Sequence, residues 1–359
     1  MECLGKSAWN HKNIIITPPD IDVYKKIISN WDGIAKPIDA LGDFETQIAK
    51  IGAILKNERV DIEKKAVLIM CADNGIVEEG ISQSGQEVTL AVVKNMALQN
   101  SSVGKMAKHA GVDTFPIDIG INSEEEIPGV LNKKIAMGTK NFMKEPAMTE
   151  KQMTEAVGAG IDMVRECKNQ GYTLLATGEM GIGNTTTSSA VAAALLGCDV
   201  SEVTGRGAGL NDEKFEQKKR VIAEAISRYD LKGKDALHIL KTVGGLDIAG
   251  LAGVCIGGAI YHVPIVLDGV ISVVAALVAD SIIPGVRDFL IPSHAGKEPA
   301  MKMMCEKLGL KPVIYGNMAL GEGTGAVMMF ALLDMIMCIY KTGSTFHDIQ
   351  IEQYERYRK

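Results

Sequence analysis

Short apolar runs that end in a glycine-rich or aspartate-bearing turn recur along the chain, and most of them lead into a helical stretch. Strands that alternate with helices form βαβ units, so this pattern predicts a mainly parallel sheet covered by helices on both faces. The expected fold class is α/β. The predicted strands are residues 66–71, 114–119, 172–177, 263–267 and 289–291.

Polar residues follow most of these runs directly. They stand at 73–75, 178–183, 268–269 and 292–294. In open parallel sheets, ligands bind beyond the carboxyl ends of the strands. We therefore expect these clusters to lie together and to form the functional site.

The segment 20–55 is helical in pattern and carries no such turns. Together with an expected C-terminal helix at 326–341, it predicts a small helical subdomain. The predicted division is a large α/β domain, 60–325, and a small helical subdomain made of 1–59 with 326–359.

Two long apolar stretches, 244–279 and 325–340, resemble membrane spans at first sight. Asp247 and Asp268 interrupt the first and Asp334 the second, so neither offers about 18 uncharged apolar residues. Both are interpreted as buried core, and no membrane partner is expected.

Composition and charge exclude several classes of protein. Of the 359 residues, 47% are hydrophobic and 23% are charged, which is typical of a globular chain rather than a disordered one. The net charge of -6 argues against a nucleic-acid partner, because such a partner needs clustered Lys and Arg.

The 7 cysteines are scattered and show no C-x-x-C or Cys/His ligand spacing. This predicts neither a disulfide framework nor a zinc site, and favours reduced cytosolic thiols. Residues 1–10 lack the basic and apolar regions of a secretory signal, so a cytoplasmic protein is expected.

The segment 178–185 has the glycine spacing of a P-loop, but Asn184 stands where the lysine should be. Without that lysine, a nucleoside-triphosphatase is poorly supported. A small-residue loop that opens a helix with Thr185 still presents free N–H groups and hydroxyls to one phosphate. A tight strand-to-helix turn with nothing bound remains the alternative.

A second glycine loop, 205–209, precedes a charged helix that contains Lys214, Lys218 and Lys219. One of these lysines could reach back to the same phosphate as a point charge. Spacing alone does not choose among the three.

Asp247 and Asp268 lie in apolar surroundings. A buried carboxylate is costly when it is unpaired, so each should bind backbone N–H groups, a ligand hydroxyl or a cation. A ribose diol is a natural partner, and capping of the next helix is an equal alternative for Asp268.

Glu322 sits in a glycine-flanked turn that opens an apolar helix, where a substrate can approach its carboxylate closely. It is a candidate general base. Glu179, inside the first glycine loop, is a second acid, and the two resemble a glycosidase pair acting at an anomeric carbon. His294 is a third candidate, although a lone histidine beside a proline turn is more often structural.

With these motifs, the chain closely resembles the nicotinate-nucleotide–dimethylbenzimidazole phosphoribosyltransferase family of cobamide biosynthesis. The resemblance runs from about residue 36 to 325. It rests on several motifs in the same order: 71–75, 178–186, 243–247, 267–269, 291–294 and 320–323.

The resemblance implies a Rossmann-like three-layer fold with a small helical domain. It implies transfer of phosphoribose from nicotinate mononucleotide to 5,6-dimethylbenzimidazole, which gives α-ribazole 5′-phosphate and nicotinate without a metal or cofactor. It also implies a homodimer whose active sites borrow residues from the partner subunit, and a heterodimer with a paralogue is a further alternative.

The resemblance also assigns residues. Glu322 is the base that takes the acceptor's N–H proton, and Glu179 is the second acid of the site. The implied phosphate and ribose positions are Gly181, Gly183, Thr185, Gly207, Lys218, Asp247 and Asp268, and the acceptor positions are Ser84, Val92, Met180 and Leu320.

Three positions depart from the commonest family pattern: Asn74 replaces a histidine, and Gly85 and Thr187 each replace a proline. The first two lie near the expected acceptor segment, 82–93, and leave the choice of acceptor open. The alternatives are a phenol-accepting enzyme, a non-catalytic partner subunit and a P-loop-like nucleotide hydrolase.

Overall fold

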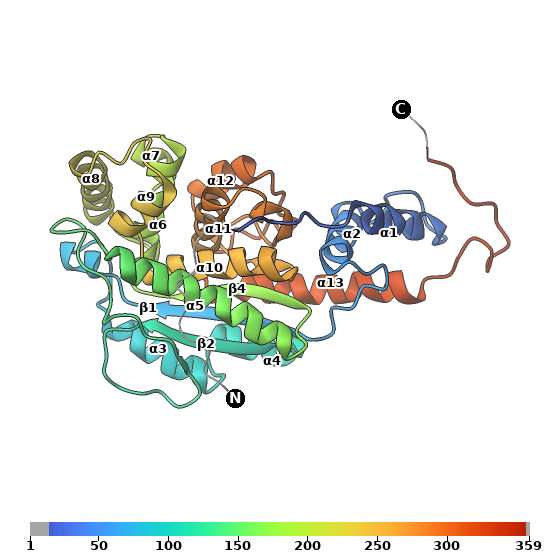
Figure 1. Ribbon diagram of the computed structural model, residues 1–359, viewed down its shortest axis with the longest axis horizontal. Helices are drawn as coiled ribbons and strands as arrows, with labels where there is room; N and C mark the ends of the chain where they lie inside the picture. The colour runs from blue at the N-terminus through green and yellow to red at the C-terminus, as the bar shows by residue number, and fades with distance from the viewer. Residues whose placement is uncertain (1–13, 357–359) are drawn as a thin grey trace.

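Six parallel strands form one sheet within residues 14–356, the part of the chain that the computed structural model describes (Figure 1). Their order across the sheet is β3-β2-β1-β4-β5-β6. The predicted α/β class with a parallel sheet is confirmed. The strands are β1 (Lys65–Ala72), β2 (Asp113–Gly120), β3 (Leu131–Asn132), β4 (Leu174–Met180), β5 (Ile265–Leu267) and β6 (Leu290–Pro292).

Two strands differ from the sequence-based prediction. Strand β3 was missed because it is only two residues long and both are exposed, so it leaves no apolar run. Strand β4 continues through Gly178 to Met180, paired with β1, where a loop was expected. Glu179 therefore lies in the strand and not in the loop that follows it.

Helices cover both faces of the sheet, which gives the expected three layers (Figure 1). Strand β1 is buried along its whole length, and its alternate residues, Ile69 and Met70, contact opposite layers. One layer contains α10 (Leu246–Tyr261) and α11 (Val270–Ile282), with α5 (Glu150–Asn169) packed on α10; the other contains α3 (Glu87–Ala97), α4 (Ser102–Ala110) and α13 (Thr324–Thr342).

The remaining helices lie mostly beyond the strand ends. They are α6 (Asn184–Leu196), α7 (Val200–Val203), α8 (Asp212–Arg228), α9 (Ala236–Val243) and α12 (Ala300–Leu308), with the short helices η2 (Gly75–Glu79) and η3 (Val286–Phe289). Helix α6 packs on α7, α8 and α9, so these four helices form one block at the carboxyl edge of the sheet (Figure 1). By contrast, η3 directly precedes β6 and packs on α10 and α11.

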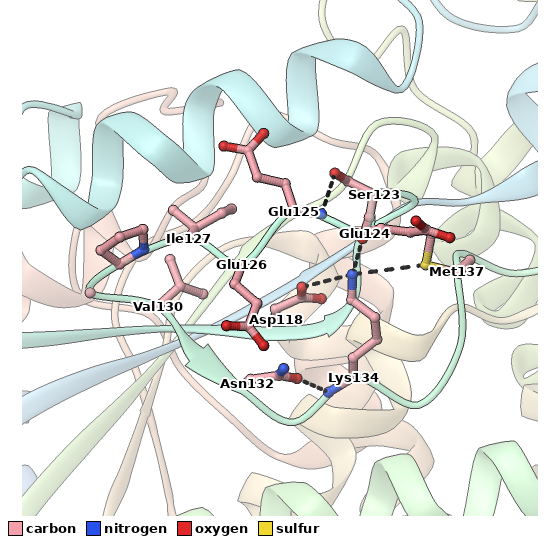
Figure 2. Close-up of a pocket in the computed structure, with 12 residues that line it drawn as sticks. Asp118, Ser123, Glu124, Glu125, Glu126, Ile127, Val130, Asn132, Lys134 and Met137 are labelled. Carbon is pink, nitrogen blue, oxygen red and sulfur yellow. Dashed lines mark hydrogen bonds and ion pairs between the residues drawn. The ribbon is translucent and has the colours of Figure 1, made fainter.

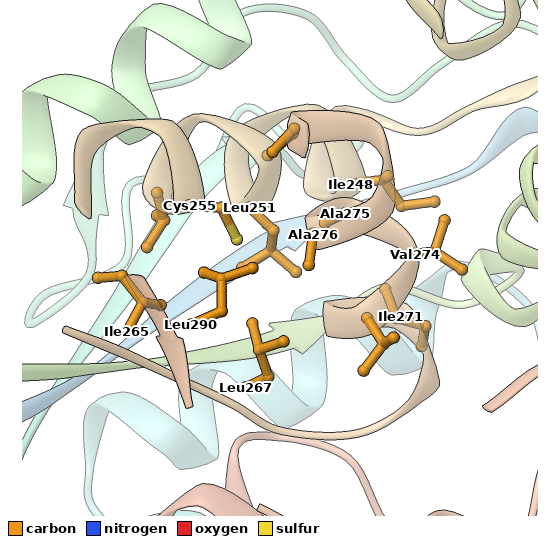
Figure 3. Packing of buried hydrophobic residues seen from close by; sticks show 14 of the residues in the cluster. Ile248, Leu251, Cys255, Ile265, Leu267, Ile271, Val274, Ala275, Ala276 and Leu290 are labelled. Carbon is orange, nitrogen blue, oxygen red and sulfur yellow. The ribbon is translucent and has the colours of Figure 1, made fainter. Parts of the chain in front are cut away.

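The stretch 244–279 is buried core, as expected. Figure 3 shows side chains of α10, α11 and the strands β5 and β6 packed against one another. Leu251, Leu267, Ala275 and Leu290 are fully enclosed there. This apolar block anchors the strand ends that carry the polar residues.

Helices α5 and α10 approach so closely that their backbones touch. A Cβ on Gly253 would lie 2.0 Å from the Val157 carbonyl oxygen, and one on Gly160 would lie 2.0 Å from the Gly250 carbonyl oxygen. Neither oxygen can move without shifting a helix, so glycine is required at both positions.

We expect Gly253→Ala to lower the free energy of unfolding by about 1–3 kcal/mol, because the added methyl overpacks a backbone contact. Urea denaturation measures the change. Gly33→Ala is the matched control: no atom lies within 4 Å of its new Cβ, and Ala favours a helix by about 1 kcal/mol. Equal destabilisation by both substitutions would contradict the close α5–α10 contact.

Helix α13 is only partly core, which corrects the expectation for 325–340. It is the one helix of the described chain that is long and apolar enough to span a membrane, and 44% of its apolar window is buried. One face of α13 packs on β1, β4 and α4. Asp334 of this helix forms an ion pair with the buried Lys65, in which Oδ1 and Nζ lie 2.8 Å apart. Met328, Met335 and Ile339 are exposed on the rest.

Helices α1 (Ile21–Gly33) and α2 (Asp43–Leu55) pack on each other and against the end of α13 (Figure 1). The rings of Trp31 and Tyr340 lie 4.9 Å apart. These contacts support the proposed small helical subdomain, whose limits at 59/60 and 325/326 stay a prediction. The described part of the chain does not include residues 1–13 or 357–359. Cys3 and the N-terminal segment that was considered as a secretory signal fall in the first of these ranges.

Candidate active site

Polar residues from four strands gather at the carboxyl edge of the sheet, as predicted. Asp73 follows β1, Glu179 is the second-last residue of β4, Asp268 follows β5 and His294 follows β6. All four are buried. The apolar strands position them, because each strand delivers its last residues to the same edge.

Lys218 of α8 is the buried cation of this region. Its side chain is 0% exposed, and its Nζ donates to Thr185 Oγ1 at 3.0 Å and to the Gly205 carbonyl oxygen at 3.1 Å. Burial lowers the pKa of Lys218 to about 8. Both hydrogen-bond partners are neutral, and the carboxylate of Glu298 lies near enough to favour the charged form of Lys218 without forming an ion pair with it. No described residue therefore places an anion in direct contact with this buried ammonium.

The other two candidate lysines point elsewhere. Lys214 Nζ donates to the Ser82 carbonyl oxygen at 3.0 Å, and Lys219 Nζ pairs with Glu216 at 2.6 Å. Of the three lysines that sequence spacing left open, Lys218 alone meets both glycine loops.

The two glycine loops close around the start of α6. Gly183, with φ of 94°, precedes the helix, and no side chain caps this end. Gly207 has φ of 52°, and a Cβ there would lie 2.8 Å from Thr185 Oγ1. A helix N-terminus without a side-chain cap, a hydroxyl and a buried ammonium are the features by which proteins commonly bind a phosphate.

Glu179 faces the interior of the site, and Asn184 Nδ2 donates to its Oε2. Burial raises the pKa of Glu179 to about 8, with a further increase from the nearby carboxylates of Asp247, Asp268 and Glu322. At neutral pH the protonated form therefore predominates, so Glu179 can donate a hydrogen bond.

This shift predicts how stability depends on pH. The folded protein favours the protonated form of Glu179. Below about pH 4.5 the group is protonated in both the folded and the unfolded chain, and the folded state is fully stable in this respect. As pH rises from there through about 8, the unfolded chain loses the proton more readily and the free energy of unfolding falls. We expect Glu179→Gln to raise the Tm by about 2–4 °C near pH 8.5 and to change it little near pH 5. Glu352→Gln, at an exposed position, is the control; a gain that does not depend on pH would contradict the assignment.

Asp247 opens α10 and has one free oxygen. Its Oδ1 accepts the Ile248 N–H at 3.0 Å, whereas the buried Oδ2 has no partner. Burial raises the pKa of Asp247 to about 6. A Cβ on Gly181 would lie 2.7 Å from that free oxygen, so Asp247 lies directly beside the first glycine loop.

Asp268 holds the start of α13. Its Oδ1 accepts N–H groups of Gly325 at 2.8 Å and Ala326 at 3.2 Å, and its Oδ2 accepts that of Gly323 at 3.0 Å. Burial raises the pKa of Asp268 to about 7, and these hydrogen bonds oppose the shift. The capping alternative is thus realised, although on α13 rather than on the next helix; a ribose contact by Asp268 stays a prediction.

Glu322 stands in a left-handed turn. Its φ is 63°, and the glycines on either side, Gly321 and Gly323, have φ of 82° and 97°. The side chain is half-buried, and its Oε2 accepts the Val103 N–H of α4 at 3.0 Å. A left-handed non-glycine residue is strained and persists only where its surroundings fix it, as they often do at functional sites.

The four predicted acceptor positions are less closely joined. Val92 on α3 and Met180 at the end of β4 are partly buried, Ser84 lies before α3, and Leu320 is 56% exposed. Helix α3 does border the first glycine loop, because Thr89 Oγ1 accepts the Ile182 N–H at 3.1 Å. The structure links these positions to the site through the elements that carry them, and no direct hydrogen bond joins them.

Sequence reasoning missed two participants. Asn184 was noted only as a missing lysine, yet it binds Glu179. Val103 contributes a backbone N–H, which every residue except proline carries, so no sequence signal could have found it.

A cavity of about 630 Å³ lies elsewhere, near the ends of β2 and β3 (Figure 2). Acidic residues line it, and Lys134 Nζ inside it already pairs with Asp118 Oδ2 at 3.1 Å. None of the predicted site residues lines this cavity. The buried polar residues lie instead at the carboxyl ends of β1, β4, β5 and β6, which makes that region the candidate active site.

Known proteins resemble the chain over nearly its whole length. A family model described as "Phosphoribosyltransferase" matches residues 16–351. The nicotinate-nucleotide–dimethylbenzimidazole phosphoribosyltransferase of Clostridium acetobutylicum is 43% identical over 348 residues, 96% of this chain and 99% of that protein. The protein of the same name from Acetivibrio thermocellus is 43% identical over 324 residues, 90% of this chain and 92% of that one.

The solved structures agree with these relatives. The crystal structure of CobT from Thermus thermophilus superimposes with a TM-score of 0.87 and 35% identity, and the match covers 93% of this chain and 100% of that one. The similarity therefore extends to the fold as a whole and is not confined to the glycine loops.

Proposed function

Because the chain belongs to the nicotinate-nucleotide–dimethylbenzimidazole phosphoribosyltransferase family, we propose that it transfers phosphoribose from nicotinate mononucleotide to 5,6-dimethylbenzimidazole or a related base. The products are α-ribazole 5′-phosphate and nicotinate. The enzyme is thus a pentosyltransferase that serves cobamide biosynthesis.

One observation carries this proposal: the buried ammonium of Lys218 sits at the open end of α6 with only neutral hydrogen-bond partners. The 5′-phosphate of nicotinate mononucleotide supplies an anion in direct contact with this ammonium, which the nearby Glu298 does not. With the phosphate held by Lys218, Thr185, Gly181, Gly183 and Gly207, the ribose extends toward the free oxygen of Asp247, which can accept a hydroxyl.

The chemistry needs a base and a fixed donor more than an acid. Nicotinate leaves from a cationic pyridinium, so it departs with a neutral ring nitrogen and requires no proton. Glu322 takes the N–H proton of the acceptor while the other ring nitrogen attacks the anomeric carbon. Glu179, protonated at neutral pH, offers a hydrogen bond within the same site. Binding both reactants side by side in one site supplies the remaining rate enhancement.

The competing functions receive less support. In a P-loop hydrolase a lysine would hold the β- and γ-phosphates, whereas Asn184 in that place is already bound to Glu179. A non-catalytic partner subunit would have no use for a strained Glu322 fixed by its neighbours. The family match favours the transferase over both.

The proposed enzyme acts as a dimer in the cytoplasm. Met328, Met335 and Ile339 form an exposed apolar face on α13, which a second copy of the chain could cover. The cysteines in residues 14–356 are free, which agrees with a reducing compartment. A homodimer is the simplest such assembly, and a heterodimer with a paralogue would use the same face.

A panel of acceptors tests the proposal. With nicotinate mononucleotide as donor, we expect benzimidazole and 5,6-dimethylbenzimidazole to react at rates within about tenfold, since one methyl in an apolar pocket is worth about 1–3 kcal/mol. Phenols such as p-cresol should react slowly, because their O–H can give its proton to the same carboxylate. Release of nicotinate, followed by chromatography, measures each rate.

Val92→Gln distinguishes an acceptor wall from core packing. If Val92 faces the acceptor, the polar side chain should slow phenols more than benzimidazoles. Equal losses with both acceptors would remove Val92 from the pocket. No nicotinate release with any base, despite tight nucleotide binding, would support the non-catalytic alternative.

A further inference from the structure

The backbone around Glu322 is fixed from two sides. Asp268 accepts hydrogen bonds from the N–H groups of Gly323, Gly325 and Ala326, which follow the residue. A Cβ on Gly178 would lie 2.6 Å from the Glu322 carbonyl oxygen, so strand β4 supports the turn from below. These contacts hold the main chain but leave the direction of the Glu322 side chain undetermined.

The N-terminus of α4 supplies that direction. Glu322 Oε2 accepts the Val103 N–H at 3.0 Å, and Ser101 Oγ accepts the next free N–H, that of Gly104, at 3.2 Å. Both acceptors therefore occupy one helix end, where the macrodipole favours negative charge. Helices α4 and α13 pack directly on each other, so the contact joins two fixed elements.

The other titratable groups beside this turn do not offer a positive charge. Three are carboxyls, and burial lowers the pKa of the histidine, which favours its neutral form. They are Glu179, Asp247, Asp268 and His294; on α4 itself, Lys105, Lys108 and His109 lie beyond the first turn.

We infer that the N-terminus of α4, through the Val103 N–H, is a positioning element that keeps the Glu322 carboxylate aimed at the acceptor. The inference rests on the proposed function, because it gives Glu322 the part of the base. Val103 acts through Glu322 and touches no reacting atom.

Ser101 allows a test that leaves the helix cap intact. Ser101→Asp keeps a good N-cap but adds a negative charge beside Glu322, whereas Ser101→Asn keeps the cap and stays neutral. Two like charges about 5 Å apart in water repel enough to shift a titration by about half a unit. We expect Ser101→Asp to move the acid-side midpoint of the kcat/KM profile upward by about 0.5–1 unit, with KM for nicotinate mononucleotide within about twofold. Ser101→Asn should match the wild type, and identical profiles for the two variants would overturn the inference.

Val103→Pro tests the hydrogen bond itself, since proline is tolerated in a first helical turn but lacks the N–H. We expect kcat to fall about tenfold in the wild-type background and not at all in a Glu322→Gln background. An equal loss in both backgrounds would show a merely structural role. If this variant does not fold, the comparison of Ser101→Asp with Ser101→Asn still tests the inference.

A wild-type protein without transfer activity would overturn the proposed function and this inference together. An active enzyme whose pH profile is the same in both Ser101 variants would overturn the inference alone.

Discussion

Glu322→Gln is expected to lower kcat by about 10²–10⁴-fold, because the amide cannot take the proton that the acceptor must lose. Gln keeps nearly the same shape and can still accept the Val103 N–H, so the strained turn should survive. Binding of nicotinate mononucleotide should stay within about threefold, since the phosphate site lies on other elements. Steady-state rates and calorimetric titration with the nucleotide measure the two quantities.

Glu126→Gln is the control for this substitution. Glu126 lines the separate cavity near β2 and β3 and is exposed, so its loss should leave kcat unchanged (Figure 2). A Glu322→Gln enzyme that turns over within about threefold of the wild type would remove Glu322 from the mechanism.

Lys218→Ala is expected to raise KM for nicotinate mononucleotide by about 10–100-fold, with a smaller effect on kcat. The substitution removes a charge-assisted contact to the phosphate, worth about 1.5–3 kcal/mol. Lys218 forms no ion pair, and the nearby Glu298 is partly exposed, so removal of Lys218 should not destabilise the apoenzyme by leaving an unpaired buried charge. Thermal melting with and without the nucleotide separates binding from folding.

Lys219→Ala is the matched control on the same helix. Lys219 pairs with Glu216 at 2.6 Å, and KM should stay within about twofold when it is replaced. Equal increases in KM for the two variants would mean that the charge of α8 as a whole, rather than a specific contact of Lys218, attracts the nucleotide.

The layers of the fold could be predicted from the sequence because burial enforces a simple pattern. Strands buried on both faces need continuous apolar runs, and β1 is such a run. Strand β3 has only two exposed residues and is defined by its pairing with β2, a non-local contact that leaves no local pattern. Strand β4 extends past Gly178 for the same reason, since pairing with β1 outweighs the low strand propensity of glycine.

The composition of the site was predictable, but the contacts within it were not. Buried acids such as Asp247 stand out in an apolar sequence, and a glycine loop before a helix indicates an anion site. By contrast, Asp268 binds N–H groups 55–58 residues away, and the choice of Lys218 among its neighbours depends on how α8 lies over α6. Such contacts follow from the tertiary fold and carry no local signature.

The exposed face of α13 also lay beyond reach of the sequence. Its apolar residues surround the helix, so their number predicts burial on all sides. The folded chain covers one side only and leaves Met335 exposed at 59%. An apolar residue that will be buried in the chain and one that awaits a partner look alike in sequence.

The identity of the products tests the central claim most directly. Purified protein is incubated with nicotinate mononucleotide and 5,6-dimethylbenzimidazole without added metal, and the products are identified by chromatography and mass spectrometry. The account predicts one nicotinate released for each α-ribazole 5′-phosphate formed, and no release without the base. Nicotinate released in the absence of base, or no release at all, would contradict it.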